Sequence, residues 1–273
     1  MKKGSLFQKM AAAPHIVWIV LFIVAPMLFV LYFAFTDADG HFSFSNISTL
    51  SQYGNVFVLS IAFALIATVI CLLIGYPLAY FMARSKPKTQ KLLMVLIMLP
   101  MWCNLLIRTY ALMALLDNGG LLNSFLESIG LDKLHIVGSD FGVILGMVYD
   151  FLPYMVLPIF TSITKLDNRY IEAAHDLGCN NIQTMTKVVL PLTASGIVSG
   201  VTMVFVPSIS TFYISQKLGA GKIDLIGDTI ERLFQNTSTY NVGAVISLVM
   251  MILILISVWI MNKFSDGEGG VII

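Results

Sequence analysis

The sequence predicts an all-α, polytopic membrane protein with six transmembrane helices. Hydrophobic residues make up 58% of its 273 residues and charged residues only 11%, whereas soluble domains carry about 25% charged residues. Six apolar stretches are each long enough to cross about 30 Å of hydrocarbon as a helix. Because backbone polar groups in lipid must pair within their own segment, we expect these stretches to be helical.

The predicted spans follow one another along the chain, with turn or charge signals between them. They lie at residues 16–35, 56–82, 92–116, 141–163, 188–214 and 242–261. The first span has an apolar run of about 20 residues, longer than the ~7–15 of a signal-peptide core, so we expect it to be retained. Pro87 and the run Asn118-Gly119-Gly120 mark two of the turns.

Lysine and arginine are distributed unequally between the two sides of the predicted membrane domain. One side collects 11 of the 16 basic residues: Lys2, Lys3, Lys9, Arg84, Lys86, Lys88, Lys91, Lys165, Arg169, Lys187 and Lys263. The other side collects 4, namely Lys133, Lys217, Lys222 and Arg232, and Arg108 lies within the third span. Since basic residues accumulate on the cytoplasmic side, we expect both termini and the 164–187 loop to be cytoplasmic.

A moderately polar segment between the fourth and fifth spans carries a distinctive spacing of acidic, small and aliphatic residues. Its marked positions are Glu172, Ala173, Ala174, Gly178, Leu190 and Pro191. Asp167 or Asn168 is suited to cap a helix, and Gly178 to end it in a left-handed turn. A second helix is expected to start near Asn180. The pattern therefore predicts a short helix–turn–helix that lies on the membrane surface and is suited to fill a groove on a partner. An ordinary amphipathic interfacial loop is the alternative.

The spacing of these positions is similar to that of the EAA loop, by which ABC-importer permeases bind their ATPase. Three further segments extend the likeness: GYPLAYFMA at residues 75–83, LPMWCNLLIRTY at 99–110 and NGGLLN at 118–123. Together they make the chain resemble, over nearly its full length, the PotB-type permease family of spermidine/putrescine ABC importers. The EAA spacing is specific for the superfamily, and the 99–110 segment is more specific for the polyamine branch.

The resemblance implies a type I ABC-importer permease (MetI-like) core. It implies a single transmembrane permease domain over 1–273, with a peripheral first helix at 16–35, a core at about 56–261 and a cytoplasmic ATPase-coupling loop at about 164–191. The residues expected to couple to the ATPase are Glu172, Ala173, Ala174, Gly178, Leu190 and Pro191. The chain would import a polyamine, delivered by an extracellular binding protein, by alternating access.

The resemblance also implies partners and a location. The partners would be a PotC-type second permease, a dimer of a PotA-type ATPase and a PotD-type substrate-binding protein, assembled in the bilayer of the bacterial inner membrane. ATP and magnesium would bind to the ATPase, so this chain would carry no cofactor, no metal site and no catalytic residue, and we expect no nucleic acid partner.

Polar and aromatic residues within the predicted spans are candidates for the substrate path. Asp150 lies about 15 Å into its span, near the midplane, and Arg108 about 25 Å along its own, which separates them by about 10 Å in depth. Asp150 is expected either to meet a substrate ammonium group or to pair structurally with a polar neighbour such as Arg108. Trp102 and Tyr154 would offer aromatic faces to the cation, and Asn104 belongs to the 99–110 segment.

Three alternatives remain open at the level of the sequence. The alternatives to a polyamine permease are a permease for another small solute, an ion-coupled secondary transporter that works alone, and a membrane enzyme. The enzyme is the weakest alternative, because the sequence has no His-Glu-x-x-His, no Gly-x-Ser-x-Gly and no cluster of metal ligands.

Overall fold

The computed structural model of the chain describes residues 14–37 and 40–265. In these ranges every extended regular element is a helix, and the only strand-like feature is an isolated bridge between Thr36 and Phe42. The prediction of an all-α protein is therefore confirmed. Lys2, Lys3 and Lys9, which were counted toward the orientation, lie outside the described residues.

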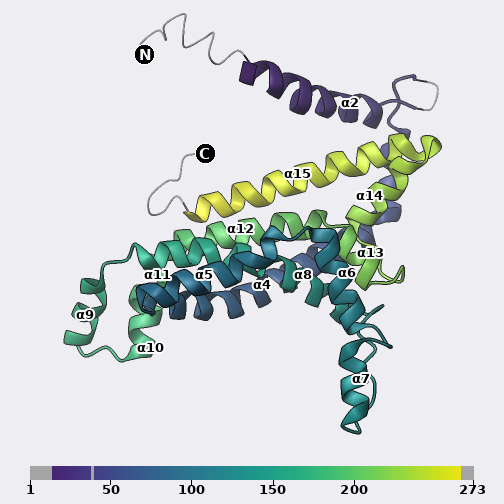
Figure 1. The fold of residues 1–273 in the computed structure, drawn as a ribbon. Helices are drawn as coiled ribbons and strands as arrows, with labels where there is room; N and C mark the ends of the chain where they lie inside the picture. The colour runs from purple at the N-terminus through teal and green to yellow at the C-terminus, as the bar shows by residue number, and fades with distance from the viewer. Residues whose placement is uncertain (1–13, 38–39, 266–273) are drawn as a thin grey trace, which may run out of the picture. The chain divides into compact units, whose positions relative to one another are not determined.

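Figure 1 traces the order of the helices along the chain. They are η1 (Val20–Val24), α2 (Ala25–Ala34), α3 (Ser45–Ser48), η2 (Thr49–Tyr53), α4 (Gly54–Arg84), α5 (Pro87–Trp102), α6 (Leu105–Leu116), α7 (Leu121–Ser128), α8 (Asp140–Thr164), α9 (Asn168–Asp176), α10 (Asn181–Thr184), η3 (Met185–Val189), α11 (Leu190–Leu192), α12 (Ala194–Ser210), α13 (Tyr213–Leu218), α14 (Ile226–Gln235), η4 (Thr237–Thr239) and α15 (Tyr240–Ser265).

Five helical stretches in the described part of the chain are long and apolar enough to cross a membrane. They are Pro14–Ala34, Asn46–Arg84, Leu105–Ser128, Asp140–Thr164 and Thr237–Lys263. A sixth span is added if the pair Asn181–Leu192 and Ala194–Ser210, bent by 69°, is counted as one. The predicted fifth span, 188–214, is thus sharply bent at Thr193 and does not form one continuous helix.

The third predicted span, 92–116, is wrong as a continuous helix. α5 ends at Trp102, and Cys103 and Asn104 have extended backbones before α6 begins at Leu105. The side chain of Asn104 accepts a hydrogen bond from the N–H of Leu106 at 2.8 Å and so caps α6. Asn competes for backbone hydrogen bonds and favours caps over helix interiors, which explains the break inside an apolar run.

The contacts within the chain define two units: Met1–Gly54 with Thr229–Leu253, and Asn55–Asp228 with Ile254–Ile273. A single domain over 1–273 stays a prediction. In the second unit α8 and α12 run side by side (Figure 1). A Cβ on Gly196 would lie 2.5 Å from Cβ of Ser162, and one on Gly200 would lie 2.8 Å from Sδ of Met155. Glycine at both positions therefore allows the close approach typical of helix packing in lipid.

The other unit joins α2 to the start of α15 through a small apolar core. Ala34 packs with Ala244 and Val245, all three buried. The ring of Phe33 meets the ring of Tyr240 edge-on, with 4.9 Å between centroids. Edge-to-face aromatic pairs of this kind stabilise a fold by about 0.5–1.5 kcal/mol beyond the contribution of the apolar area that they bury.

Candidate functional site

The predicted coupling loop, residues 164–191, forms a helix–turn–helix whose first helix is α9. Asp167 caps this helix, because its carboxylate accepts a hydrogen bond from the N–H of Arg169 at 3.0 Å. The guanidinium of Arg84, at the end of α4, donates a hydrogen bond to the side-chain oxygen of Asn168, the first residue of α9. The beginning of the loop is thus fixed both by its own cap and by the second span. Residues 164–191 are called the coupling segment below.

The turn after α9 has the geometry that was predicted for Gly178. Its φ is +83°, in the left-handed region. The N–H of Gly178 donates to the carbonyl of His175 at 2.9 Å, and the N–H of Cys179 donates to the carbonyl of Ala174 at 3.0 Å. These two bonds form a Schellman motif, which satisfies carbonyls that the helix end leaves unpaired. The sequence reasoning is confirmed at this turn.

The second helix of the coupling segment begins with a capping box. The side chain of Asn180 accepts from the N–H of Gln183 at 2.8 Å, and the side chain of Gln183 accepts from the N–H of Asn180 at 3.0 Å. This reciprocal pair satisfies two of the N–H groups at the helix start. The predicted start near Asn180 is confirmed, and α10 then widens into the π-helical turn η3.

The six predicted coupling residues differ in exposure. Glu172, Ala173, Gly178 and Pro191 are exposed, Leu190 is half-buried, and Ala174 is buried within the chain. The small side chain of Ala174 therefore serves packing inside this chain, whereas Ala173 is open to a partner.

Three large apolar side chains of the coupling segment are exposed on its surface. Leu177 is 86% exposed, Ile182 75% and Tyr170 57%. Of these three, Ile182 was missed by the sequence reasoning, although an isoleucine two positions after the Asn180 cap is a detectable signal. Contiguous exposed apolar side chains mark surfaces that bind another protein, so these three are candidates for contact with a partner.

Among the candidates for the substrate path, the structure brings Arg108 and Asp150 together. Nε of Arg108 forms an ion pair with the carboxylate of Asp150, and the two side chains are only 6% and 0% exposed. Thr109 donates to the other carboxylate oxygen at 3.2 Å, and Arg108 also donates to the carbonyl of Pro100 at 2.9 Å. The predicted 10 Å separation in depth was wrong, because the rise was counted along a helix that breaks before α6.

The remaining path candidates are Trp102, Asn104 and Tyr154, and their environments differ from that of the ion pair. Trp102, at the end of α5, is 72% exposed, and Asn104 caps α6 as described. Tyr154 follows Asp150 by one helical turn on α8 and is half-buried, with its ring centroid 6.4 Å from that of Phe151. The part of the chain that the structure describes contains no group of three His, Cys, Asp or Glu side chains able to hold a metal ion.

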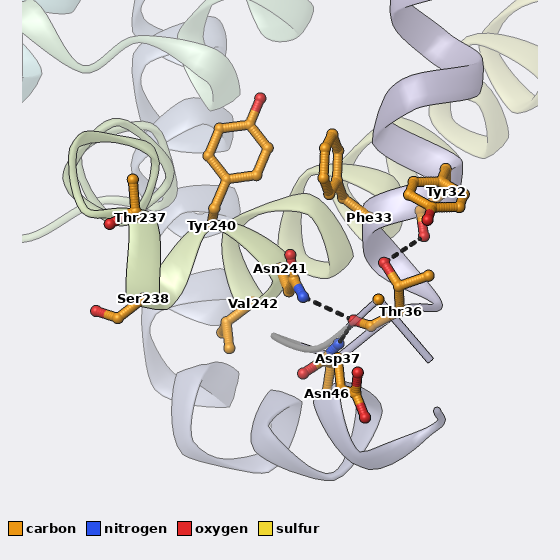
Figure 2. Close-up of a pocket in the computed structure, with 11 residues that line it drawn as sticks. Tyr32, Phe33, Thr36, Asp37, Asn46, Thr237, Ser238, Tyr240, Asn241 and Val242 are labelled. Atoms are coloured by element: carbon orange, nitrogen blue, oxygen red, sulfur yellow. Dashed lines mark hydrogen bonds between the residues drawn. The ribbon is translucent and has the colours of Figure 1, made fainter. Parts of the chain in front are cut away.

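A cavity of about 490 Å³ lies in the first unit and includes none of the predicted site residues. The side-chain amides of Asn46 and Asn241 both donate to the carbonyl of Thr36, each at 2.8 Å (Figure 2). Tyr32 and Tyr240 contribute aromatic rings to its wall. Asn46 thus ties the chain after α2 to α3, and Asn241 ties it to the start of α15, a link that sequence patterns do not reveal.

Comparison with known proteins gives a consistent set of similarities. Residues 75–267 match the family described as "Binding-protein-dependent transport system inner membrane component". The chain is 37% identical to the spermidine/putrescine transport system permease protein PotB of Haemophilus influenzae, covering 94% of this chain and 93% of that protein. It is also 37% identical to PotB of Escherichia coli, with 92% and 98% covered.

A solved structure with the same fold is a chain of a bacterial alginate ABC transporter in complex with a periplasmic protein. The TM-score is 0.78 at 20% sequence identity, and the match covers 97% of this chain and 96% of that one. At this identity the likeness concerns the fold alone. It agrees with the helical architecture described above and with the family match over residues 75–267.

Proposed function

This chain belongs to the family of binding-protein-dependent transport system inner membrane components, and we propose that it is the permease subunit of an ATP-driven polyamine importer. The substrate class rests on the PotB proteins, which are named for spermidine/putrescine transport and resemble this chain over more than nine-tenths of its length. Members of this family are transport components of the inner membrane, and the chain is homologous to such a permease over 94% of its length.

The observation that carries the mechanism is the shape of the coupling segment. Two capped helices meet at the left-handed turn of Gly178, and Glu172, Leu177 and Ile182 are all exposed on this segment. Such a knob fits a groove on an ATPase subunit. Glu172 makes polar contacts there, Leu177 and Ile182 lose water on binding, and Ala173 permits close approach. ATP and magnesium bind to that ATPase and not to this chain.

The complete transporter in this proposal has four kinds of subunit. A PotC-type permease pairs with this chain, a PotA-type ATPase dimer drives it, and a PotD-type binding protein delivers the polyamine from outside. Both termini and the coupling segment are cytoplasmic, in keeping with the 11-to-4 distribution of basic residues. Closure of the ATPase dimer pulls on the coupling segment and reorients the membrane helices, so that the path alternates between its outward and inward openings.

Within the path, the charge of Asp150 is committed to Arg108. We therefore assign the pair a positioning role, in which it holds α6 against α8 and the carbonyl of Pro100. Trp102 and Tyr154 are the aromatic groups proposed to contact the ammonium groups of the substrate, since aromatic faces attract cations. Asn104 sets the break between α5 and α6 beside Trp102.

Co-purification tests the proposal. The chain, co-expressed with the three expected partners, should be isolated with the ATPase, and ATP hydrolysis should rise when binding protein loaded with spermidine or putrescine is added. An amino acid or a sugar should not replace the polyamine. Stimulation by another solute alone would support the alternative, an importer permease for a different substrate.

A further inference from the structure

One face of α4 carries three residues spaced by four positions. Tyr76, Tyr80 and Arg84 recur at this interval and therefore lie above one another on the helix surface. The guanidinium of Arg84 lies over the ring of Tyr80, 5.5 Å from its centroid. The row begins within the GYPLAYFMA segment and ends one residue after it, and none of its three residues is among the proposed docking or path residues. It is called the α4 stripe below.

The last residue of the stripe holds the beginning of the coupling segment. Arg84 donates to the side chain of Asn168, 84 positions further along the chain. A cavity of about 400 Å³ lies at the same corner and includes Arg84, Gln90, Thr164 and Asn168 in its wall. The start of α9 therefore has space in which to move while it stays attached to α4.

The first residue of the stripe holds the chain where it leaves the coupling segment. The hydroxyl groups of Tyr76 and Thr193 lie 3.0 Å apart, and both residues are buried. Thr193 donates its own hydroxyl proton to the carbonyl of Val189 at 2.8 Å. Since a hydroxyl has one proton, Tyr76 must be the donor to Thr193. Breaking such a buried bond leaves a polar group unsatisfied, which is costly.

Both helices are weakened where this buried bond joins them. The chain bends by 69° at Thr193, between Leu192 and Ala194. On the other side, Pro77 follows Tyr76 inside α4, and a proline there removes one backbone hydrogen bond. Arg84 lies eight residues beyond Tyr76, about 12 Å along the helix. The stripe thus reaches from a pivot inside the bundle to the start of the coupling segment.

We propose that the α4 stripe transmits the movement of the coupling segment to the membrane helices. Tyr76 and Arg84 are positioning residues in this role: they hold the two ends of the segment to a single helix. Displacement of the segment by an ATPase then changes the angle between α4 and α12 at the bond between Tyr76 and Thr193. The inference rests on the proposed function, because it assumes an ATPase that moves the segment.

The test uses the complete transporter in proteoliposomes and measures polyamine uptake per ATP hydrolysed. Tyr76→Phe removes only the buried hydroxyl and should lower this ratio about fivefold, the size expected for one buried hydrogen bond. Arg84→Met, which has no donor, should lower it about twofold, because an exposed polar contact contributes less. Thr68→Val is the matched control, since its buried hydroxyl on α4 bonds only to the carbonyl of Ala64, and it should behave as wild type.

Two further measurements separate transmission from a purely structural role. The double variant Tyr76→Phe/Thr193→Val should lower the ratio of uptake to hydrolysis no further than Thr193→Val alone. Arg84→Lys, which keeps a donor for Asn168, should have a ratio close to that of the wild type. Hydrogen exchange over residues 168–193 should be faster in Tyr76→Phe than in Thr68→Val. Faster exchange with an unchanged ratio would make the bond structural only and would overturn the inference. Wild-type complex without ATP-dependent uptake would instead contradict the proposed function.

Discussion

Arg108 and Asp150, 42 positions apart in the sequence, form an ion pair inside the helix bundle. Their side chains are 6% and 0% exposed, so neither charge has much access to water or lipid headgroups. Arg108 also donates a hydrogen bond, 2.9 Å long, to the carbonyl of Pro100. Pro100 lies near the end of α5. The pair therefore connects three helices, α5, α6 and α8, in the part of the sequence that carries the proposed path.

Asp150→Asn should destabilise the chain. Removing one member of a buried ion pair leaves the other charge unpaired, at a cost of about 3–5 kcal/mol. We expect a clearly lower melting temperature of the purified chain in detergent and lower expression. Adding Arg108→Gln should recover part of the loss.

Asp140→Asn is the control for that experiment, because it makes the same chemical change at an exposed residue, the first of the same helix. It should melt like wild type. If Asp150→Asn also melts like wild type but abolishes uptake, Asp150 acts on the substrate and the positioning role is wrong. If uptake is unchanged as well, Asp150 does not belong to the path.

Gly178→Val should uncouple the ATPase without preventing membrane insertion. A Cβ at Gly178 meets no atom within 4 Å, so the penalty comes from the positive φ of +83° alone. A left-handed backbone costs a residue with a side chain about 1–2 kcal/mol. The turn should therefore shift and misalign α9 and α10, which is measured as less ATPase co-purified and less stimulated hydrolysis.

Gly130→Val is the matched control for the change at Gly178. Gly130 has a φ of +79°, also with no atom within 4 Å, and lies just after α7. The strain is similar but falls outside the coupling segment, so association with the ATPase should be retained. Equal loss in both variants would show that the effect at Gly178 is general destabilisation.

Leu177→Ser should weaken ATPase binding and leave the isolated chain stable. Leu177 is 86% exposed, so little packing within the chain is lost. If its side chain is buried against the ATPase, about 1.5–3 kcal/mol of binding free energy disappears, roughly a tenfold or larger drop in affinity. Leu121→Ser, at a position 75% exposed on α7, should leave the affinity unchanged. A normal affinity in Leu177→Ser would place the docking surface elsewhere.

Cys179 reports the orientation of the coupling segment. Its thiol is half-buried, Cys71 is buried and Cys103 is exposed, so Cys103→Ser leaves Cys179 as the accessible thiol. A membrane-impermeant thiol reagent should not modify it in intact cells but should do so after permeabilisation. Ready labelling from outside would reverse the orientation and remove the segment from the reach of a cytoplasmic ATPase.

The sequence was most informative where structure is local. The left-handed turn at Gly178 and the helix start at Asn180 follow from the intrinsic preferences of Gly and Asn, so they could be predicted. Apolar length located the spans but not their interruptions: the break at Asn104 and the bend at Thr193 lie within hydrophobic runs. Depth counted along an unbroken helix therefore misplaced Arg108.

Contacts between distant parts of the chain could not be predicted. Tyr76 meets Thr193 across 117 positions, and Asn46 and Asn241 converge on one carbonyl, of Thr36. Periodicity within a helix shows which residues share a face, but not which other helix that face meets. The same limit applied to Asp150, for which both pairing with Arg108 and contact with substrate were compatible with the sequence.

The most direct test of the account is spermidine uptake into proteoliposomes that contain this chain and its partner permease, measured with and without the ATPase subunit. Loaded binding protein is supplied outside the vesicles and ATP inside, on the ATPase side of the complex. We predict ATP-dependent uptake that requires the ATPase and the binding protein and is lost in Gly178→Val. Uptake that continues without the ATPase, driven by an ion gradient alone, would contradict the account and identify the chain as a secondary transporter.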